Sequence, residues 1–399
     1  MAILEAKDNI YWVGALDKDL RTFDVIMRTE FGTTYNSYLV RGKEKTVLFE
    51  TVKDAFFEEH LARIQEICDP SEIDYIVLNH TEPDHSGGIL RLLELSPKAK
   101  VVASKVALGY LGEILNQPVP SMAVTEKDTI DLGGMTLHFL SVPLLHWPDS
   151  MYTYIPEAKA LFTCDSFGSH YADDRVFNDL MPDVNFDEAY RYYFDNIMAP
   201  FANPHVFNAL KKIEPLDVEI ICNGHGPVLR TDLSRYVNLY REWSTPVQKE
   251  HPDVAIVYVS SYGYTKKMAE KIAEGIRAAG ISEVECLDLE VIGQDAAKEK
   301  ISQASGFLLG SPTMVGDALT PVWQVLTAIN PIIHKGKFAG AFGSYAWGGE
   351  GVPNLIERMG QLNLKLPMEG LRIKLNPSEE QLRQAFAYGE GFANALLGK

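Results

Sequence analysis

The sequence predicts a two-domain α/β protein, in which an αββα sandwich is followed by a doubly wound parallel sheet. Short β-rich runs with intercalated helices fill residues 1–250, a pattern typical of sheets covered by helices. From residue 254 the pattern becomes a regular alternation of strand and helix, which indicates a parallel sheet. Two prolines and several charged residues interrupt residues 241–253. We therefore expect domains at residues 1–250 and 251–399.

The elements expected in the first domain are short. Turn signals separate predicted strands at residues 10–13, 34–40, 46–49, 75–79, 100–103, 135–142, 151–155 and 160–163. Apolar residues recur at helical spacing over residues 57–67, which places Phe57, Leu61 and Ile64 on one face of a helix. Residues 88–95 are also expected to be helical.

The second domain of about 150 residues has a typical domain size. We expect its strands at residues 254–259, 282–288, 306–309 and 337–342, and a helix over residues 266–279 that Gly280 closes. The spacing leaves loops at the carboxyl ends of successive strands, where doubly wound sheets bind their ligands.

Composition excludes several classes of protein. A formal net charge of −17 disfavours nucleic acid and anionic membrane surfaces as partners, and the acidic excess lies almost entirely in residues 1–250. No window approaches the roughly 20 apolar residues of a membrane helix. The N-terminus lacks the features of a signal peptide, so we expect a cytoplasmic protein.

The four cysteines are scattered, without a Cys-x-x-Cys pair. This spacing disfavours a disulfide framework, a rubredoxin-type iron site and an iron–sulfur cluster. Each cysteine lies in or beside an apolar stretch, so we expect small buried hydrophobic residues at Cys68, Cys164, Cys222 and Cys286.

A cluster of metal-ligand residue types follows the apolar run at residues 75–78. His80, Glu82, Asp84 and His85 place two histidines and two carboxylates within six positions. Zinc hydrolases of the metallo-β-lactamase superfamily carry a second His where this chain has Glu82. Imidazole and thiolate suit zinc, whereas additional carboxylates suit harder, redox-active iron. Glu82 therefore favours redox chemistry over hydrolysis.

Three further residues complete the predicted site. His146, Asp165 and His225 each lie near a strand end followed by Gly, Pro or Ser, where a sandwich brings its loops together. The full set of four imidazoles and three carboxylates suits two metals with one bridging carboxylate and open positions for substrate. The other histidines outside the predicted pocket are expected to be ordinary hydrogen-bonding residues, namely His60, His138, His205, His251 and His334.

Three loops of the second domain predict a flavin site. Residues 260–265 combine hydroxyl side chains and a glycine at a strand-to-helix turn, which suits a phosphate. No Gly-x-Gly-x-x-Gly is present there, so a mononucleotide is favoured over a dinucleotide. Aromatic residues among glycines in the other two loops suit an isoalloxazine ring. Each loop alone is equally consistent with a helix cap or a surface aromatic residue; the three together favour FMN.

The candidate FMN contacts are Ser260, Ser261, Tyr262, Gly263, Tyr264 and Thr265 in the first loop, Ser311, Pro312, Thr313, Met314 and Val315 in the second, and Ser344, Tyr345, Ala346, Trp347 and Gly348 in the third.

With these motifs combined, essentially the whole chain resembles a flavodiiron protein, or A-type flavoprotein. The family has a metallo-β-lactamase-like domain followed by a flavodoxin-like domain. The resemblance implies two iron ions per chain and FMN. It implies that one iron is bound by His80, Glu82 and His146, that the other is bound by Asp84, His85 and His225, and that Asp165 bridges them together with a hydroxide or oxide.

The resemblance also implies reduction of nitric oxide to nitrous oxide, or of dioxygen to water. His170 and Tyr193 are candidate proton donors in the pocket, although a structural role is as well supported for each. The chain ends at Lys399 without the rubredoxin or flavin reductase extensions of some members. We therefore expect a separate electron donor, either rubredoxin or another reductant such as reduced deazaflavin or a flavin reductase.

Distance favours an oligomer. A 250-residue domain has a radius of gyration of about 18 Å, so flavin and iron of one chain can lie too far apart for fast electron transfer. We expect a head-to-tail homodimer, or a dimer of dimers. Two alternatives stay open, namely a binuclear zinc hydrolase with a flavodoxin-like regulatory domain and an electron carrier or redox sensor with a vestigial metal site. The sequence does not set the preference between the two gases.

Overall fold

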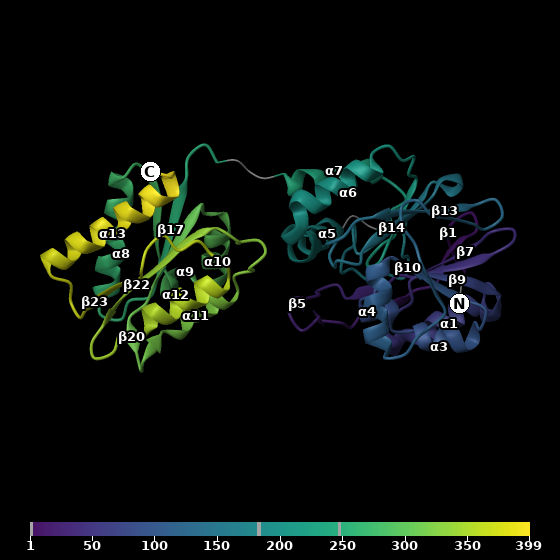
Figure 1. Cartoon of the computed structure of the whole chain (residues 1–399), viewed down its shortest axis with the longest axis horizontal. Helices are drawn as coiled ribbons and strands as arrows, with labels where there is room; N and C mark the ends of the chain where they lie inside the picture. The colour runs from purple at the N-terminus through teal and green to yellow at the C-terminus, as the bar shows by residue number, and fades with distance from the viewer. Residues whose placement is uncertain (1–2, 182–184, 246–248) are drawn as a thin grey trace. The chain divides into compact units, whose positions relative to one another are not determined.

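The computed structural model describes residues 3–181, 185–245 and 249–399. The chain divides into two compact units, Met1–Pro246 and Val247–Lys399, so the division falls a few residues before the expected position. Figure 1 shows the chain passing once from the first unit to the second. Within the described residues, no helix is long and apolar enough to cross a membrane.

The first unit contains two large sheets. The order of the seven-stranded sheet is β1 (Leu4–Lys7), β2 (Ile10–Trp12), β7 (Tyr38–Arg41), β8 (Thr46–Phe49), β9 (Ile73–Leu78), β10 (Lys100–Ala103) and β11 (Ser121–Ala123). The order of the five-stranded sheet is β12 (Thr129–Asp131), β13 (Thr136–Ser141), β14 (Met151–Ile155), β15 (Ala160–Cys164) and β16 (Ile220–Asn223).

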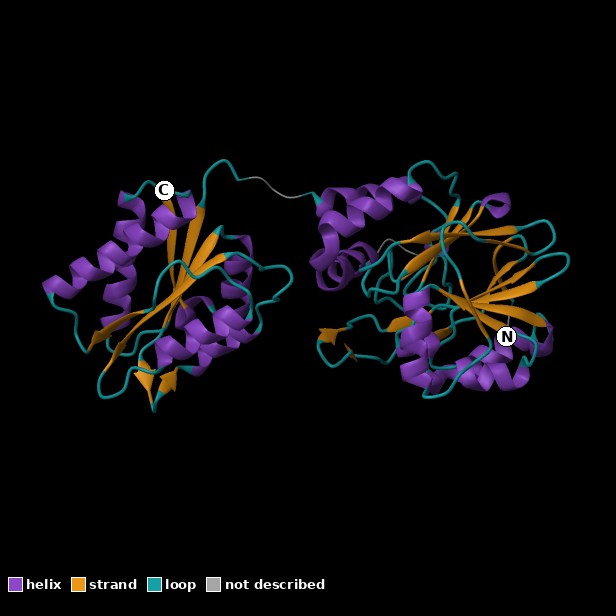
Figure 2. Ribbon diagram, in the orientation of Figure 1, coloured by secondary structure: helices purple, strands orange, loops and turns teal. Residues whose placement is uncertain are grey.

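Helices cover the outer faces of both sheets, as Figure 2 shows. One layer consists of α1 (Phe57–Gln65), α3 (Ile89–Leu95) and α4 (Lys105–Leu115), and the other of α5 (Phe186–Tyr193), α6 (Phe207–Ile213) and α7 (Leu233–Ser244). Strand residues alternate between the helix layer and the space between the sheets, where the rings of Phe49 and Phe162 stack at 3.8 Å. The predicted αββα sandwich is confirmed.

The expected strand at residues 34–40 is wrong in one respect. It is two strands, β6 (Thr33–Tyr35) and β7, which belong to different sheets. The break has a physical cause, because Asn36 donates its side-chain N–H to the Gly226 carbonyl at 2.8 Å and Ser37 donates to the Phe49 carbonyl at 3.0 Å. Strand β6 pairs with β3 (Ala15–Asp17), and a small hairpin joins β4 (Thr22–Phe23) to β5 (Met27–Arg28).

The second unit has a parallel five-stranded sheet in the order β18 (Glu283–Asp288), β17 (Asp253–Tyr258), β19 (Gly306–Gly310), β22 (Phe338–Tyr345) and β23 (Leu371–Lys374). One face is covered by α8 (Tyr264–Ala278) and α13 (Glu379–Leu397), and the other by α9 (Leu289–Ile292), α10 (Gln294–Gln303), α11 (Thr320–Thr327) and α12 (Gly351–Gln361). A hairpin of β20 (Thr313–Met314) and β21 (Asp317–Ala318) follows β19. The predicted doubly wound sheet is confirmed. From β17 the chain adds β18 on one side and β19 on the other, so the strand order reverses between β17 and β19.

Candidate metal centre and flavin site

The segment that carries the metal motif is held in place by hydrogen bonds to Asp149. It leaves β9 at Leu78 and turns into a short helix, α2 (Pro83–Ser86). The carboxylate of Asp149 accepts hydrogen bonds from the backbone N–H of Thr81 at 2.9 Å and from its hydroxyl at 2.6 Å. The same carboxylate lies 3.1 Å from Nδ1 of His80. Asp149 therefore orients the segment and turns Nε2 of His80 inward.

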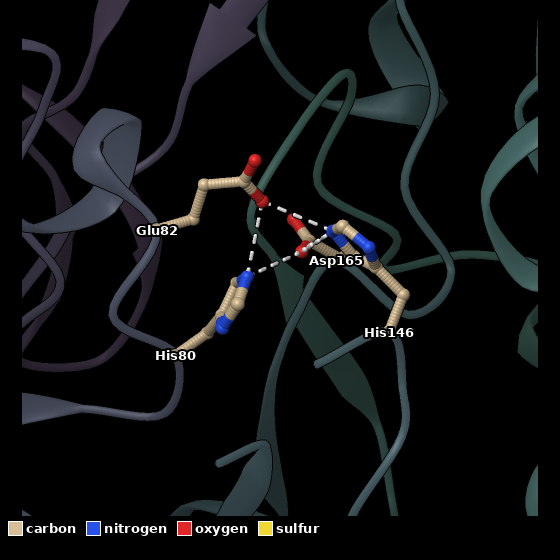
Figure 3. A group of neighbouring side chains, drawn as sticks. All are labelled: His80, Glu82, His146 and Asp165. Carbon is tan, nitrogen blue, oxygen red and sulfur yellow. Dashed lines mark hydrogen bonds and ion pairs between the residues drawn. The ribbon is translucent and has the colours of Figure 1, made fainter. Parts of the chain in front are cut away.

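A first group of ligand atoms gathers His80, Glu82, His146 and Asp165 within 4.8 Å of one another. Oε2 of Glu82 lies 3.1 Å from Nε2 of His80 and 3.0 Å from Nε2 of His146. Figure 3 shows the Glu82 carboxylate pointing between the two imidazoles, with the Asp165 carboxylate in contact with both rings. Oδ2 of Asp165 lies 3.3 Å from Nε2 of His146.

A second group gathers Asp84, His85 and His225, with ligand atoms again within 4.8 Å of one another. Nε2 of His225 lies 3.2 Å from Oδ2 of Asp84. Oδ1 of Asp165 lies 3.0 Å from Nε2 of His85 and 3.4 Å from Nε2 of His225. Asp165 thus presents one oxygen to each group, the arrangement that a bridging carboxylate requires.

The electrostatics of the cluster fit cations. Although burial opposes its ionisation, His85 and His146 hold the pKa of Asp165 well below its usual range. Burial also opposes protonation of His225, but Asp165 and Asp84 raise its pKa to about 10. In the metal-free protein the histidines therefore retain protons whose positive charge balances the carboxylates. Metal ions would replace those protons.

The buried carboxylate oxygens of the cluster also fit bound cations. Among the described residues, neither carboxylate oxygen of Asp84 and not Oδ2 of Asp165 makes a hydrogen bond of good geometry, although all three atoms are buried. Their neighbours are imidazole nitrogens at 3.2–3.6 Å, and buried carboxylate oxygens that face only other ligand-type atoms are typical of a metal site. The seven residues therefore fit two metal ions that share Asp165.

The two candidate proton donors lie beside the second group. The ring of His170 is 5.6 Å from that of His225 and 4.9 Å from that of Tyr193, between centroids. Nδ1 of His170 lies 3.0 Å from the Thr33 hydroxyl. Burial lowers the pKa of His170 to about 3, so this imidazole is neutral. Their catalytic role stays a prediction.

A surface cavity of about 660 Å³ leads to His170. Its lining residues are Arg21, Arg28, Thr29, Glu30, Phe31, His170, Glu188, Ala189 and Tyr192. The hairpin of β4 and β5 contributes part of this wall and places the exposed Asp24 near Glu82. Although Asp24 is exposed as a residue, partial burial of its carboxyl group and the neighbouring Glu82 and Asp84 raise its pKa to about 6.

Sequence reasoning did not assign Asp24, Asp149 or Glu50 to the site. Asp149 had a signal, because it lies three residues after His146. Asp24 and Glu50 had none, since only the packing of distant segments brings them to the cluster.

The three predicted flavin loops lie at the carboxyl ends of β17, β19 and β22, which are neighbours in the sheet, although Ser344 and Tyr345 of the third loop form the end of β22 itself. The first and third loops are joined where the hydroxyls of Thr265 and Ser344 lie 3.1 Å apart. The hydroxyl of Ser260 accepts from the backbone N–H of Lys266 at 3.2 Å, near the start of α8. Helix α8 begins at Tyr264, two residues before its expected start, after Gly263 with a φ of 78°.

Burial divides the candidate FMN contacts. Thr265, Ser311 and Ser344 are buried beneath the loops, and the hydroxyl of Ser311 accepts from the backbone N–H of Leu319. The exposed set lies on the loops themselves and includes Tyr262, Val315 and Trp347, the last with 92% of its surface exposed. The loops thus present apolar and aromatic side chains to solvent at the edge of the sheet where a flavin would bind. The individual contacts stay predictions.

Comparisons with known proteins agree with both units. The family model described as ODP family beta lactamase matches residues 33–226, and the Flavodoxin model matches residues 256–389. The chain is 41% identical to Flavo-diiron protein FprA2 of Clostridium acetobutylicum, over 99% of this chain and 100% of that protein. It is also 41% identical to Type A flavoprotein fprA of Rhodobacter capsulatus, over 98% of this chain and 91% of that protein.

Solved structures show the same arrangement of elements. The flavodiiron protein from Giardia intestinalis aligns over 100% of this chain and 97% of its own, with a TM-score of 0.72 and 30% identity. The rubredoxin oxygen:oxidoreductase of Desulfovibrio gigas aligns over 100% of this chain and 99% of its own, with a TM-score of 0.75 and 31% identity.

The fold and the site define a metalloflavoprotein, with a two-metal cluster on one unit and a flavodoxin sheet in the other. The chain belongs to the flavodiiron protein family. The family carries a diiron site and FMN, and its members are oxidoreductases. The seven converging side chains fit the first cofactor, and the loops after β17, β19 and β22 fit the second.

Proposed function

We propose that this protein reduces nitric oxide to nitrous oxide, dioxygen to water, or both, at a diiron site supplied with electrons by FMN. The observation that carries the proposal is the position of Asp165 between two ligand groups, one of which contains Glu82 between two imidazoles. Three carboxylates around two metal positions suit redox-active iron rather than zinc. The relative from Desulfovibrio gigas, a rubredoxin oxygen:oxidoreductase, supports dioxygen as a substrate.

When bound, the irons and the flavin supply the electrons and the positions at which the gas is reduced. The chain's own residues hold and orient this chemistry. Asp149 fixes the ring of His80, and the Thr34 carbonyl, 2.6 Å from Nδ1 of His225, fixes that ring, so both Nε2 atoms face inward. We propose His170 and Tyr193 as the groups that hold protons beside the second ligand group.

We further propose a separate electron donor of the rubredoxin type, with reduced deazaflavin or a flavin reductase as the other candidates. The exposed aromatic edge of the flavin loops and the nearly neutral charge of the second unit support docking of a small redox protein there. A head-to-tail homodimer, or a dimer of such dimers, would shorten the path from flavin to iron. A cytoplasmic location stays a prediction.

The test is anaerobic turnover with each gas in turn, using chemically reduced rubredoxin, after metal and flavin analysis of anaerobically purified protein. We expect about two irons and one FMN per chain, with consumption of at least one gas. Two zincs per chain would instead support a hydrolase. Bound iron and reduced flavin without consumption of either gas would support an electron carrier or sensor.

A further inference from the structure

A buried carboxylate lies behind the metal cluster and belongs to none of the predicted ligands. Glu50 follows β8, with 2% of its surface exposed. Its φ is 57°, in the left-handed region that a non-glycine residue rarely adopts. Its backbone N–H donates to the Val77 carbonyl at 2.9 Å, and Ser37 donates to its carbonyl at 2.9 Å. Surroundings that enforce an unfavourable backbone angle are common at functional positions.

The two oxygens of the Glu50 carboxylate have different environments. Oε1 accepts a hydrogen bond at 2.8 Å from the backbone N–H of Asn79, the residue directly before His80. Oε2 is buried, and no donor reaches it from the described part of the chain. A buried carboxylate oxygen without a donor is costly, so its surroundings should contain one.

Two buried side-chain donors without a hydrogen-bond partner in the described ranges are candidates, Nδ2 of Asn79 and Nδ1 of His85. Nε2 of His85 faces the metal cluster, 3.0 Å from Oδ1 of Asp165. Nδ1 lies on the other side of the ring, buried, and has no hydrogen-bond partner within residues 3–181, 185–245 and 249–399. A carboxylate oxygen of Glu50, a ring nitrogen of His85 and Sγ of Cys164 lie within 4.8 Å of one another. Cys164 is a poor alternative partner, because a neutral thiol is a weak donor and a weak acceptor.

The other two fully buried histidines of the cluster already have such a partner. Nδ1 of His80 lies against the carboxylate of Asp149, and Nδ1 of His225 lies against the carbonyl of Thr34. The small cavity beside Glu50, which Asn79 and Cys164 also line, has no room for a water molecule. Asn79 already gives its backbone N–H to Oε1 of Glu50, and its Oδ1 accepts from the Thr153 hydroxyl. Among the described residues Nδ1 of His85 has no acceptor to fix its ring, so we favour His85 as the partner of the free oxygen.

We propose that Glu50 is a positioning residue whose free carboxylate oxygen accepts a hydrogen bond from Nδ1–H of His85 when Nε2 of His85 binds metal. The pair repeats on the second metal position what Asp149 does for His80 on the first. Such an acceptor fixes the tautomer and orientation of the ring and increases the basicity of the ligand nitrogen. It also adds a further carboxylate beside the cluster, beyond the three ligands and Asp149, and negative charge there would favour the oxidised state of bound iron.

The backbone around His85 leaves the ring little freedom. A Cβ on Gly224 would lie 2.9 Å from Cε1 of His85, so the Gly224 backbone closes one side of the imidazole. The carbonyl of His85 accepts from the backbone N–H of Thr51 at 2.7 Å and from its hydroxyl at 2.8 Å. The residue after Glu50 therefore holds the backbone of His85, which keeps the imidazole beside the Glu50 carboxylate.

The variant Glu50→Gln tests the proposal in the full-length holoprotein. Two N–H groups, from Asn79 and His85, require an acceptor, and a carboxylate serves both, whereas the single amide oxygen of Gln serves one. We expect iron affinity, measured by competition with a chelator, to fall by about 10–100-fold. We also expect an exchangeable histidine ring N–H signal of the diferrous protein to shift or disappear in the proton NMR spectrum.

Two variants serve as references. Asp149→Asn should give an effect of similar size through His80. Glu219→Gln, which removes an exposed carboxylate that binds Lys7, should leave iron affinity and the histidine signals unchanged. A purely structural role for Glu50 would alter the melting temperature of the metal-free protein and leave the histidine signal of the iron-loaded protein in place.

The proposal rests on the assignment of His85 as a metal ligand, and the two can fail separately. Wild-type protein without iron would contradict the proposed function, whereas iron-loaded wild-type and Glu50→Gln proteins with equal affinities and equal histidine signals would overturn the role of Glu50. If the variant does not fold, a crystal structure of the iron-loaded wild type decides. A distance of about 3 Å between the Glu50 carboxylate and Nδ1 of His85 supports the proposal, and a distance beyond about 3.5 Å overturns it.

Discussion

At the residue scale, the metal cluster depends on how closely the backbone of one loop approaches a ligand. Gly224 directly follows β16, and a hypothetical Cβ on it would lie 2.9 Å from Cε1 of His85 and 3.0 Å from the backbone of Cys164. Contacts this short require something to move, and the Cys164 backbone at the end of β15 has little freedom. The side chain that can yield is the imidazole ring.

We therefore expect Gly224→Ala to displace His85 and lower iron affinity by about tenfold or more, with FMN content unchanged because the flavin loops belong to the other unit. Iron and flavin analysis of the purified variant checks this. Gly112→Ala is the matched control, since a Cβ there meets no described atom within 4 Å. Full iron content in Gly224→Ala would contradict the close approach.

A buried histidine outside the metal cluster, His60, is expected to make the stability of the protein depend on pH. His60 is fully buried, with Nδ1 2.7 Å from the Val13 carbonyl. Burial lowers the pKa of His60 to about 4, below the value of about 6.5 in an unfolded chain. Between these two values the unfolded state binds more protons, so stability is lost as the pH falls from about 6.5 to about 4.

The free energy of unfolding that His60 removes over this pH range is at most about 3 kcal/mol, which corresponds to the full shift of its pKa. Gln at position 60 cannot titrate, so the free energy of unfolding of His60→Gln should fall less steeply with decreasing pH. The difference in slope should correspond to about one proton bound on unfolding. Urea unfolding of metal-free protein at several pH values measures the slopes. Parallel slopes for the variant and the wild type would show that His60 is not the group responsible.

At the scale of elements, α8 and α13 lie unusually close together. A Cβ on Gly275 would lie 2.0 Å from the Phe386 carbonyl oxygen, and a Cβ on Gly389 would lie 2.1 Å from the Ile272 carbonyl oxygen. These glycines therefore allow backbone-to-backbone contact between the two helices. The terminal helix α13 covers one face of the sheet through this contact, although the sequence pattern alone did not predict that helix.

The contact reverses the usual effect of a helical Gly→Ala change. Alanine normally stabilises a helix interior by about 1 kcal/mol relative to glycine. We expect Gly389→Ala to lower the stability of the second unit by about 1–3 kcal/mol, as overpacking does. Gly360→Ala in α12, where the nearest described atom to a Cβ is 3.9 Å away, should instead be neutral or stabilising. Thermal unfolding followed by flavin fluorescence distinguishes the two.

The first unit shows a similar limit of sequence patterns. Residues 34–40 are uniformly β-rich, yet they form two strands in different sheets because Asn36 and Ser37 bond to carbonyls distant in the sequence. Neither partner lies within a local window, so periodicity cannot reveal the break. By contrast, α3 and β10 were predicted nearly to the residue, since their burial follows local alternation.

At the scale of the whole molecule, the two cofactors are expected to stabilise different units. The metal ligands all lie within Met1–Pro246 and the flavin loops all lie within Val247–Lys399. A ligand stabilises the unit that binds it in its folded state. Removal of iron should therefore lower the unfolding temperature of the first unit, and removal of FMN that of the second.

Calorimetry of the full chain, with and without each cofactor, checks this expectation. We expect two transitions, of which chelation of iron lowers one by several degrees and leaves the other within about a degree. A single transition that shifts equally on loss of either cofactor would show that the units unfold as one.

The sequence by itself determined the two fold classes, the seven candidate metal ligands and the position of the flavin loops. Each of these depends on local information, because alternation, strand ends and ligand-type residues can be recognised within a few positions. Tertiary structure alone decided that Asp165 faces both ligand groups and that Asp149 and the Thr34 carbonyl orient the histidines. It also placed Glu50 behind His85. These relations join residues far apart in the chain, and their geometry depends on the packing of two sheets.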